Sequence, residues 1–138
     1  MRYDIELKRV YEPPSKTDGT RVLVDRLWPR GKRRDELVFT EWFKDASPTA
    51  KLRRDWHNQK IDDNTFAQDY RRELEDQPES LVPLMRHARR GRLVLLTAAR
   101  DPLHSHLPVL RDALLTALRL EDEDADGREP SSPVCYNK

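Results

Sequence analysis

The residues best suited to bind a ligand follow directly after a short apolar run. Residues 22–24 are Val-Leu-Val, and the oppositely charged residues Asp25 and Arg26 come next. An apolar run without polar alternation is typical of a strand buried on both faces, and open α/β sheets bind ligands outside the carboxyl ends of their strands. Asp25 is therefore a candidate catalytic group and Arg26 a candidate ligand-binding group. The alternative is a structural ion pair between them, whose loss would destabilise the fold.

The next residues form a stiff loop that presents an arginine. Pro29 fixes its own φ and keeps Trp28 out of the α region, whereas Gly31 permits a turn that other residues resist. Arg30, held between the two, offers a planar fork that suits phosphate or carboxylate. Trp28 either fills the core or provides a stacking surface for a base or sugar, and the sequence leaves both roles open.

A second charged group follows the apolar run of residues 92–97. Arg100 stands just beyond the point where that predicted strand ends. If the two strands are neighbours in one sheet, Arg26, Arg30 and Arg100 converge at its carboxyl edge. The helix predicted after Ser105 begins at the same place, and free N–H groups at a helix start favour anions. The sequence thus predicts an anion site made of arginine side chains, Ser105 and a helix N-terminus.

Histidines near the same helix start are candidates for proton transfer. The positive end of the helix dipole should keep His104 neutral, so that it could act as a base or hydrogen-bond donor; alternatively, it caps or packs locally. His104 and His106 are two residues apart, which does not suit a two-histidine metal face on a helix. His57 and His87 have no recognisable partner, and we treat them as structural.

Motifs for a cofactor or a metal are absent from the sequence. There is no Gly-rich phosphate loop, no Cys/His spacing for zinc and no Gly-x-Ser-x-Gly elbow. We therefore expect no cofactor and no metal. Any phosphate would have to be held by arginine side chains and a helix end.

The elements that must position these residues are those of an α/β fold. Residues 22–24 and 92–97 predict two buried strands, and residues 3–11 alternate weakly, as in a strand near a sheet edge. The loop of residues 12–19 is short for a helical crossover, so an antiparallel pairing of the first two strands stays open. Apolar residues between positions 37 and 43 mark a short amphipathic segment.

Helices are predicted from caps and apolar spacing. Helix starts are expected at polar residues that can cap them: Ser47 before Pro48, Asp62 or Asp63, and Ser105, which puts Pro108 in the first turn. Apolar stripes run along the helices at Phe66, Tyr70 and Leu74 and again from Leu107 to Leu118. From residue 121 onward the apolar period is lost, which predicts a domain of residues 1–120 and a disordered tail of residues 121–138.

Composition fits a small cytoplasmic protein. A chain of 138 residues suits a single domain, and a net charge of +1 argues against a general nucleic-acid coat protein. The single cysteine, Cys135, cannot form an internal disulfide, which fits a reducing compartment. Without an apolar run of membrane-spanning length or a signal-peptide pattern, we expect a cytoplasmic protein with no membrane partner.

The motif of residues 21–31, Arg-Val-Leu-Val-Asp-Arg-Leu-Trp-Pro-Arg-Gly, resembles the signature of the small bacterial YeaO-like proteins, a domain-of-unknown-function family. The resemblance extends over residues 5–118 and includes two shorter pieces, Leu52-Arg53 and Ala99-Arg100-Asp101. It implies a Rossmann-like, three-layer α/β arrangement, with a short, mainly parallel sheet flanked by helices, and no established activity. Thr97 and Ser105 stand where a more distant branch has cysteines, so the resemblance implies neither thiol chemistry nor a cysteine-ligated metal.

The first functional hypothesis is binding of a phosphate- or carboxylate-bearing small molecule at the carboxyl ends of the strands. Arg26, Arg30 and Arg100 would hold the anion. Asp25 or His104 would be the catalytic group if the protein is an enzyme, which the sequence leaves open. This hypothesis predicts that binding depends chiefly on Arg30 and Arg100.

The second hypothesis is a nucleic-acid-associated or protein-interaction module that uses the basic loop of residues 28–34. Trp28 would then be the stacking surface. Binding would fall steeply with salt, and the contributions of Lys32, Arg33 and Arg34 would be roughly additive. A third reading, in which the motif serves folding alone, predicts that no ligand binds; the oligomeric state is left open.

Overall fold

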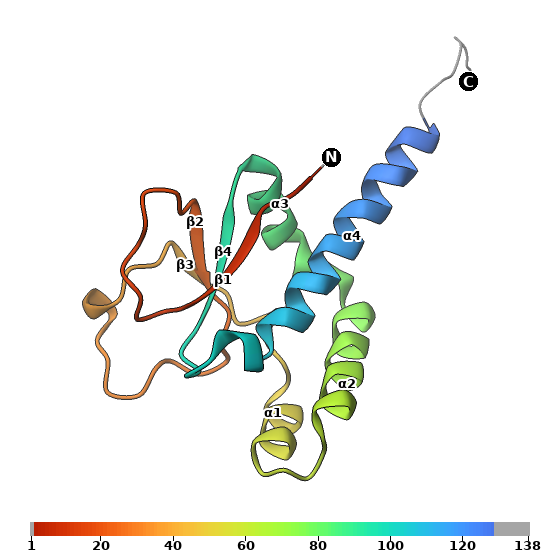
Figure 1. Ribbon diagram of the computed structural model, residues 1–138. Coiled ribbons are helices and arrows are strands. Elements are labelled where there is room, and N and C mark those ends of the chain that lie inside the picture. Colours follow the sequence, from red (N-terminus) through yellow and green to blue (C-terminus); the bar gives the residue numbers. More distant parts are fainter. Residues whose placement is uncertain (1, 129–138) are drawn as a thin grey trace.

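The computed structural model describes residues 2–128 and has a four-stranded sheet at its centre. Its strands are β1 (Ile5–Arg9), β2 (Thr20–Leu23), β3 (Glu41–Trp42) and β4 (Leu93–Thr97), in the order β1-β4-β2-β3 (Figure 1). All three pairings are parallel. The predicted α/β class with a parallel sheet is confirmed. The antiparallel pairing of the first two strands is wrong, because β4 lies between them and pairs with both.

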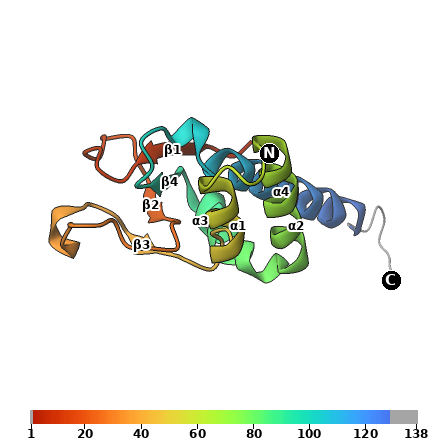
Figure 2. The same cartoon turned by 90° about the horizontal axis from the view of Figure 1, so that it is seen from below.

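The helices cover one face of this sheet. They are α1 (Ala50–His57), α2 (Asp63–Asp76), α3 (Val82–Arg90) and α4 (Leu107–Arg128), with short 3-10 turns η1 (Arg34–Glu36), η2 (Pro78–Leu81) and η3 (Pro102–His104). Buried residues from all four helices share one cluster with the sheet, and α2 packs beside α4 (Figures 1 and 2). Loop residues, rather than helices, cover the opposite face.

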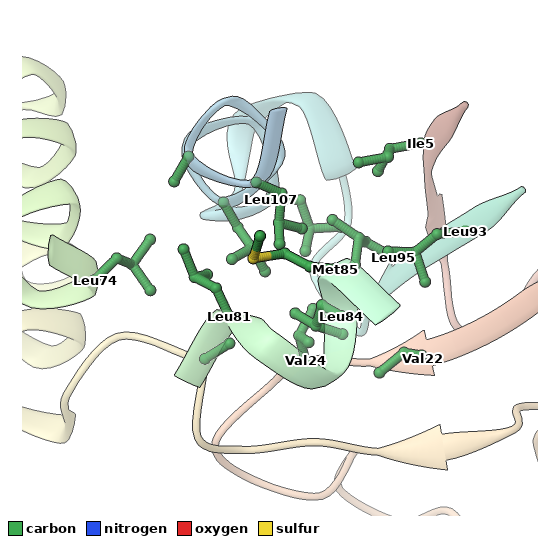
Figure 3. Close-up of a cluster of buried hydrophobic side chains, with 14 of the residues drawn as sticks. Ile5, Val22, Val24, Leu74, Leu81, Leu84, Met85, Leu93, Leu95 and Leu107 are labelled. Carbon is green, nitrogen blue, oxygen red and sulfur yellow. The ribbon is translucent and has the colours of Figure 1, made fainter. Parts of the chain in front are cut away.

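Strand β4 is the centre of the core, because all five of its residues are buried. Alternate residues of a strand face opposite sides of the sheet. Leu93 and Leu95 therefore pack with the helices (Figure 3), whereas Val94 and Leu96 pack with loop residues such as Leu37. Full burial of each Leu stabilises the fold by about 2 kcal/mol. The uninterrupted apolar run in the sequence reflects this burial on both faces.

Two helix caps lie where the sequence predicts them. The Asp62 carboxylate accepts a hydrogen bond from the backbone N–H of Thr65 at 2.8 Å, at the start of α2. The Ser105 hydroxyl accepts one from the backbone N–H of Leu107 at 3.1 Å, at the start of α4. Pro108 consequently lies in the first turn of α4, where its missing N–H leaves no carbonyl unpaired.

The predicted cap of α1 is wrong by two residues. Thr49 is the N-cap, and its hydroxyl accepts from the backbone N–H of Leu52 at 3.3 Å. Ser47 lies three residues before the first residue of α1, and its hydroxyl donates to the carbonyl oxygen of Lys44. The segment before α1 is therefore a separate turn, which becomes important for the site below.

The C-terminal helix is longer than expected. Helix α4 continues to Arg128, so the boundary after residue 120 falls too early for residues 121–128. Arg89 on α3 pairs with Glu121 at 2.6 Å and with Asp122 at 2.9 Å, and Tyr3 donates to Asp122 at 2.6 Å. Residues 129–138 of the expected tail, with Cys135, lie outside the described residues.

Candidate functional site

A cavity of about 720 Å³ lies at the carboxyl ends of β2 and β4. The pairing of these two strands brings the ends of both together, as the sequence analysis required. Helix α1 and the η3 turn lie at the same end of the sheet (Figure 1). The cavity wall consists of residues 25–30, 97–101 and 104–106, together with Pro48, Arg53, Trp56, His57, Gln59 and Asp63. All seven residues predicted for the site are in this wall: Asp25, Arg26, Trp28, Arg30, Arg100, His104 and Ser105.

Asp25 is only half satisfied by the protein. Its Oδ2 accepts a hydrogen bond from the backbone N–H of Ala98 at 2.8 Å, which ties the end of β2 to the end of β4. Its Oδ1 is buried, and none of the described residues donates a hydrogen bond to it. Polar groups in a protein interior are usually paired, so an unpaired carboxylate oxygen needs an explanation.

Arg26 does not pair with Asp25, so the predicted ion pair between them is wrong. Its Nε donates to the carbonyl oxygen of Pro48 at 2.8 Å and its Nη2 to that of Ser47 at 3.4 Å. The guanidinium thus ties the loop after β2 to the turn before α1. Two of its five N–H donors therefore serve the wall of the cavity.

Three other arginines line the cavity and have no hydrogen-bond or ion-pair partner among the described residues. Arg30 and Arg100 are exposed, and within residues 2–128 their side chains make no hydrogen bond or ion pair. Arg53, on α1, has a buried Nε–H that meets no acceptor among the described residues. A buried donor without an acceptor costs about 1–3 kcal/mol. Unlike Arg26, these three guanidinium groups are therefore free to meet an anion.

The two histidines at the start of α4 have different surroundings. His106 Nε2 donates to the carbonyl oxygen of Val24 at 2.6 Å and lies 3.7 Å from Asp25 Oδ1. Burial lowers the pKa of His106, and the nearby Asp25 carboxylate only partly opposes this effect. His106 is therefore a neutral, buried hydrogen-bond donor.

His104 behaves in the opposite way to the prediction. Its side chain is 81% exposed, and its Nδ1 lies 2.7 Å from the Asp101 carboxylate. This hydrogen bond raises the pKa of His104 instead of keeping the imidazole neutral. Ser105 is also engaged locally, since its hydroxyl donates to Pro102 at 2.6 Å while capping α4.

Trp28 belongs to the core on the loop side of the sheet. Its ring lies 5.6 Å from that of Phe39 and 5.2 Å from that of Trp42, centroid to centroid. Its Nε1 donates to the carbonyl oxygen of Lys32 at 2.6 Å. These contacts favour the core role over the stacking surface.

The structure also brings residues to the cavity that the sequence analysis missed. Arg53, Trp56 and His57 have the spacing i, i+3 and i+4, which places them on one face of α1. Gln59, in the turn after α1, has a φ of 60° and is the only residue other than glycine with a positive φ among the described residues. The helical spacing was the one available signal, but the sequence did not show which way that face points. His87, treated as structural, pairs with Glu41 at 3.1 Å.

Comparison with known proteins identifies relatives over most of the chain. A family model described as "Inactive DUF488-N3 subclade" matches residues 4–137. The chain is 39% identical over 111 residues to the uncharacterised protein YeaO of Escherichia coli K12, which covers 80% of this chain and 96% of that protein. It is 38% identical over 110 residues to the uncharacterised protein Rv3073c of Mycobacterium tuberculosis H37Rv, covering 80% and 92%. No solved structure matches.

Proposed function

We propose that this chain, which belongs to the YeaO-like domain-of-unknown-function family, binds a small phosphate- or carboxylate-bearing molecule in the cavity. The observation that carries the proposal is the buried Nε–H of Arg53, which has no acceptor among the described residues. Arg30 and Arg100 line the same cavity, and neither has a partner in that part of the chain.

An anion would satisfy these groups better than water does. A guanidinium presents parallel N–H donors that match two oxygens of a phosphate or carboxylate, and such charge-assisted bonds are about twice as strong as neutral ones. Arg53 comes from α1, whereas Arg30 and Arg100 come from the loops after β2 and β4. Donors that approach from three elements can surround an anion. A surface run of basic residues cannot do so.

Binding without turnover is the form of the proposal with most support. The family model that matches the chain is described as an inactive subclade. His104 is engaged with Asp101, and the candidate base Asp25 holds the backbone of Ala98. Each carboxylate or imidazole thus already holds a neighbouring group of the protein, and we assign a chemical step to neither residue.

The nucleic-acid alternative has less support from the loop geometry. The ring of Trp28 packs against two other aromatic rings, so a base would have to displace core contacts in order to stack on it. Arg33 pairs with acidic neighbours of its own segment, Asp35 and Glu36. The basic loop thus resembles a solvated surface, where each exposed ion pair contributes about 0–1 kcal/mol.

A matched pair of variants tests the cavity. Arg53→Gln and Arg54→Gln remove the same charge from neighbouring positions of α1, but only Arg53 lines the cavity. Calorimetric titration with inorganic phosphate at constant ionic strength should show binding to the unmodified protein. We expect Arg53→Gln to weaken it about tenfold, the equivalent of one charge-assisted hydrogen bond of about 1.4 kcal/mol. Arg54→Gln should change it less than about twofold.

The same assay distinguishes the cavity from the nucleic-acid alternative, which uses the basic loop. The double substitution of Lys32→Gln with Arg33→Gln should leave phosphate binding within about twofold of the unmodified protein, because these side chains lie outside the cavity wall. Equal weakening by this double variant and by Arg53→Gln would contradict the proposal. So would the absence of any phosphate binding by the unmodified protein.

A further inference from the structure

We infer that the ligand carries hydroxyl groups beside its anionic group, as a phosphorylated polyol or sugar does. This inference rests on the proposed anion-binding function and adds the chemistry of the rest of the molecule. Its basis is the Asp25 carboxylate in the cavity wall, because a negative charge there does not help to hold an anion. Like charges repel, so a bare phosphate beside Asp25 would bind less well than it does without that group.

The protein leaves most of the Asp25 carboxylate unpaired. A carboxylate offers about four acceptor positions, and among the described residues only the Ala98 N–H donates a hydrogen bond to Asp25. The neighbouring Arg26 does not neutralise the charge, because its guanidinium is bound to backbone carbonyls. His106 does not either, since its Nε2–H points to Val24 and lies 3.7 Å from Oδ1.

A hydroxyl group supplies what this carboxylate lacks. An O–H donor pairs with a carboxylate oxygen in a short, charge-assisted hydrogen bond. Asp25 keeps 16% of its side-chain surface exposed and lines the cavity, so a ligand in the cavity lies beside this side chain. A ligand with an anionic end for the arginines and a hydroxyl for Asp25 would therefore satisfy both kinds of group at once.

The size and lining of the cavity also fit an organic skeleton. A volume of about 720 Å³ lies within the range of small-molecule sites and far exceeds what one phosphate ion fills. Trp56 contributes an aromatic wall, which is held in place because its ring stacks on Phe66 with centroids 3.7 Å apart. Leu27 and Pro48 add apolar surface to the same cavity. The carbon atoms of a polyol or sugar would lie against these groups.

Two esters with the same phosphate group provide the test. Glycerol 3-phosphate carries hydroxyl groups, and propyl phosphate has the same three-carbon chain without them. We expect the unmodified protein to bind glycerol 3-phosphate about tenfold more tightly in calorimetric titrations, equivalent to about 1.4 kcal/mol. In Asp25→Asn the preference should fall below about twofold, because the charge-assisted bond is lost. Asn keeps a carbonyl oxygen for the Ala98 N–H, and circular dichroism checks that the variant is folded.

The same substitution should have the opposite effect on inorganic phosphate. Asp25→Asn removes a like charge from the cavity, so phosphate should bind more tightly to the variant than to the unmodified protein. A preference for glycerol 3-phosphate that disappears in Asp25→Asn, together with tighter phosphate binding, supports the inference.

Other results separate the inference from the proposed function. Equal binding of the two esters by the unmodified protein would overturn the inference and leave the anion site intact, and this comparison needs no variant. A preference that persists in Asp25→Asn would overturn the role of Asp25. If phosphate binds but neither ester does, the inference also fails. If neither phosphate nor either ester binds, the proposed function fails with it.

Discussion

Two aspartates lie at opposite ends of strand β2 and are used in different ways. Asp18, two residues before the strand, has a side chain that is 2% exposed. Its carboxylate accepts hydrogen bonds from Lys8 at 2.7 Å and from Arg21 at 2.8 Å, and from the backbone N–H of Ser15 at 3.2 Å. Asp25, two residues after the strand, accepts one hydrogen bond from the part of the chain that the structure describes, and its buried Oδ1 has no donor there.

The difference separates a structural charge from an available one. The partners of Asp18 are themselves engaged: Arg21 also donates to the carbonyl oxygens of Val38 and Glu12, at 2.8 Å each. Both carboxylate oxygens of Asp18 are thus paired within the protein, so this charge is not available to a ligand. In contrast, Asp25 Oδ1 and the Nε–H of Arg53 are buried without a hydrogen-bond partner among the described residues. This lowers stability by an amount that proteins commonly accept at binding sites. Four predictions sharpen or break this contrast.

The largest effect is expected from removing the charge of Asp18. Asp18→Asn leaves the buried guanidinium of Arg21 and the partly exposed ammonium group of Lys8 facing an amide, so it should lower the free energy of unfolding by about 3 kcal/mol. Asp25→Asn removes a charge that has no cationic partner within hydrogen-bond reach, and it should change that free energy by less than about 1 kcal/mol. Urea unfolding of the two variants measures both. Equal losses would show that the two carboxylates are equally structural.

A substitution at Gly19, next to Asp18, should lower the stability of the fold nearly as much. A Cβ on Gly19 would lie 2.1 Å from the carbonyl oxygen of Arg92, which is backbone and also accepts from Thr20. Gly19→Ala should therefore cost about 2 kcal/mol or more, as overpacking does. Gly91→Ala is the control, because a Cβ there meets no atom within 4 Å. Thermal unfolding that ranks the two variants equally would rule out the close approach at Gly19.

Acid should weaken the Asp18 end of β2. Burial by itself raises the pKa of Asp18, but the hydrogen bonds from Lys8, Arg21 and Ser15 outweigh it and lower the pKa to about 2. A lowered pKa means that the contribution of Asp18 to stability is complete above pH 4. It is lost as the pH falls from 4 to 2, and it amounts to about 2 kcal/mol.

Comparison of the unmodified protein with Asp18→Asn isolates this contribution from that of the other carboxylates. The difference in their urea midpoints should shrink between pH 5 and pH 2. A difference that stays constant over that range would mean that Asp18 has an ordinary pKa in the folded protein.

The smallest effects on stability are expected from substitutions of Arg30 and Arg100, which line the cavity. Arg30→Gln and Arg100→Gln remove side chains without a partner among residues 2–128, so each should alter the free energy of unfolding by less than about 0.5 kcal/mol. Arg21→Gln, which loses the bonds of a guanidinium that is 4% exposed, is the contrasting variant. A large loss in Arg30→Gln or Arg100→Gln would place these residues with the structural charges.

The sequence predicted what depends on local pattern. The apolar runs at residues 22–24 and 92–97 gave two neighbouring buried strands, and the stripe of Phe66, Tyr70 and Leu74 is buried in the core. Because parallel strands end at the same edge of a sheet, the predicted site residues lie around one cavity. That step also needed the two strands to be neighbours, which the sequence left as a condition and the pairing of β2 with β4 meets.

Other features depend on contacts that no local pattern contains. Successive residues of an extended chain point in opposite directions, so Asp25 and Arg26 find separate partners despite being neighbours in sequence. Arg53 reaches the cavity because α1 packs at that end of the sheet. The spacing of residues within α1 does not specify this packing. The extension of α4 depends likewise on Arg89, which is 32 residues from Glu121.

The central claim is that Arg53 meets an anion inside the cavity, and its Nε–H signal in ¹H–¹⁵N NMR spectra tests this claim most directly. The Nε–H of Arg21 is an internal reference, because it is bound to the carbonyl oxygen of Val38. On titration with inorganic phosphate at constant ionic strength, the account predicts a saturable shift of the Arg53 signal while the Arg21 signal stays unchanged. An Arg53 signal that does not respond, with shifts confined to residues 32–34, would contradict it.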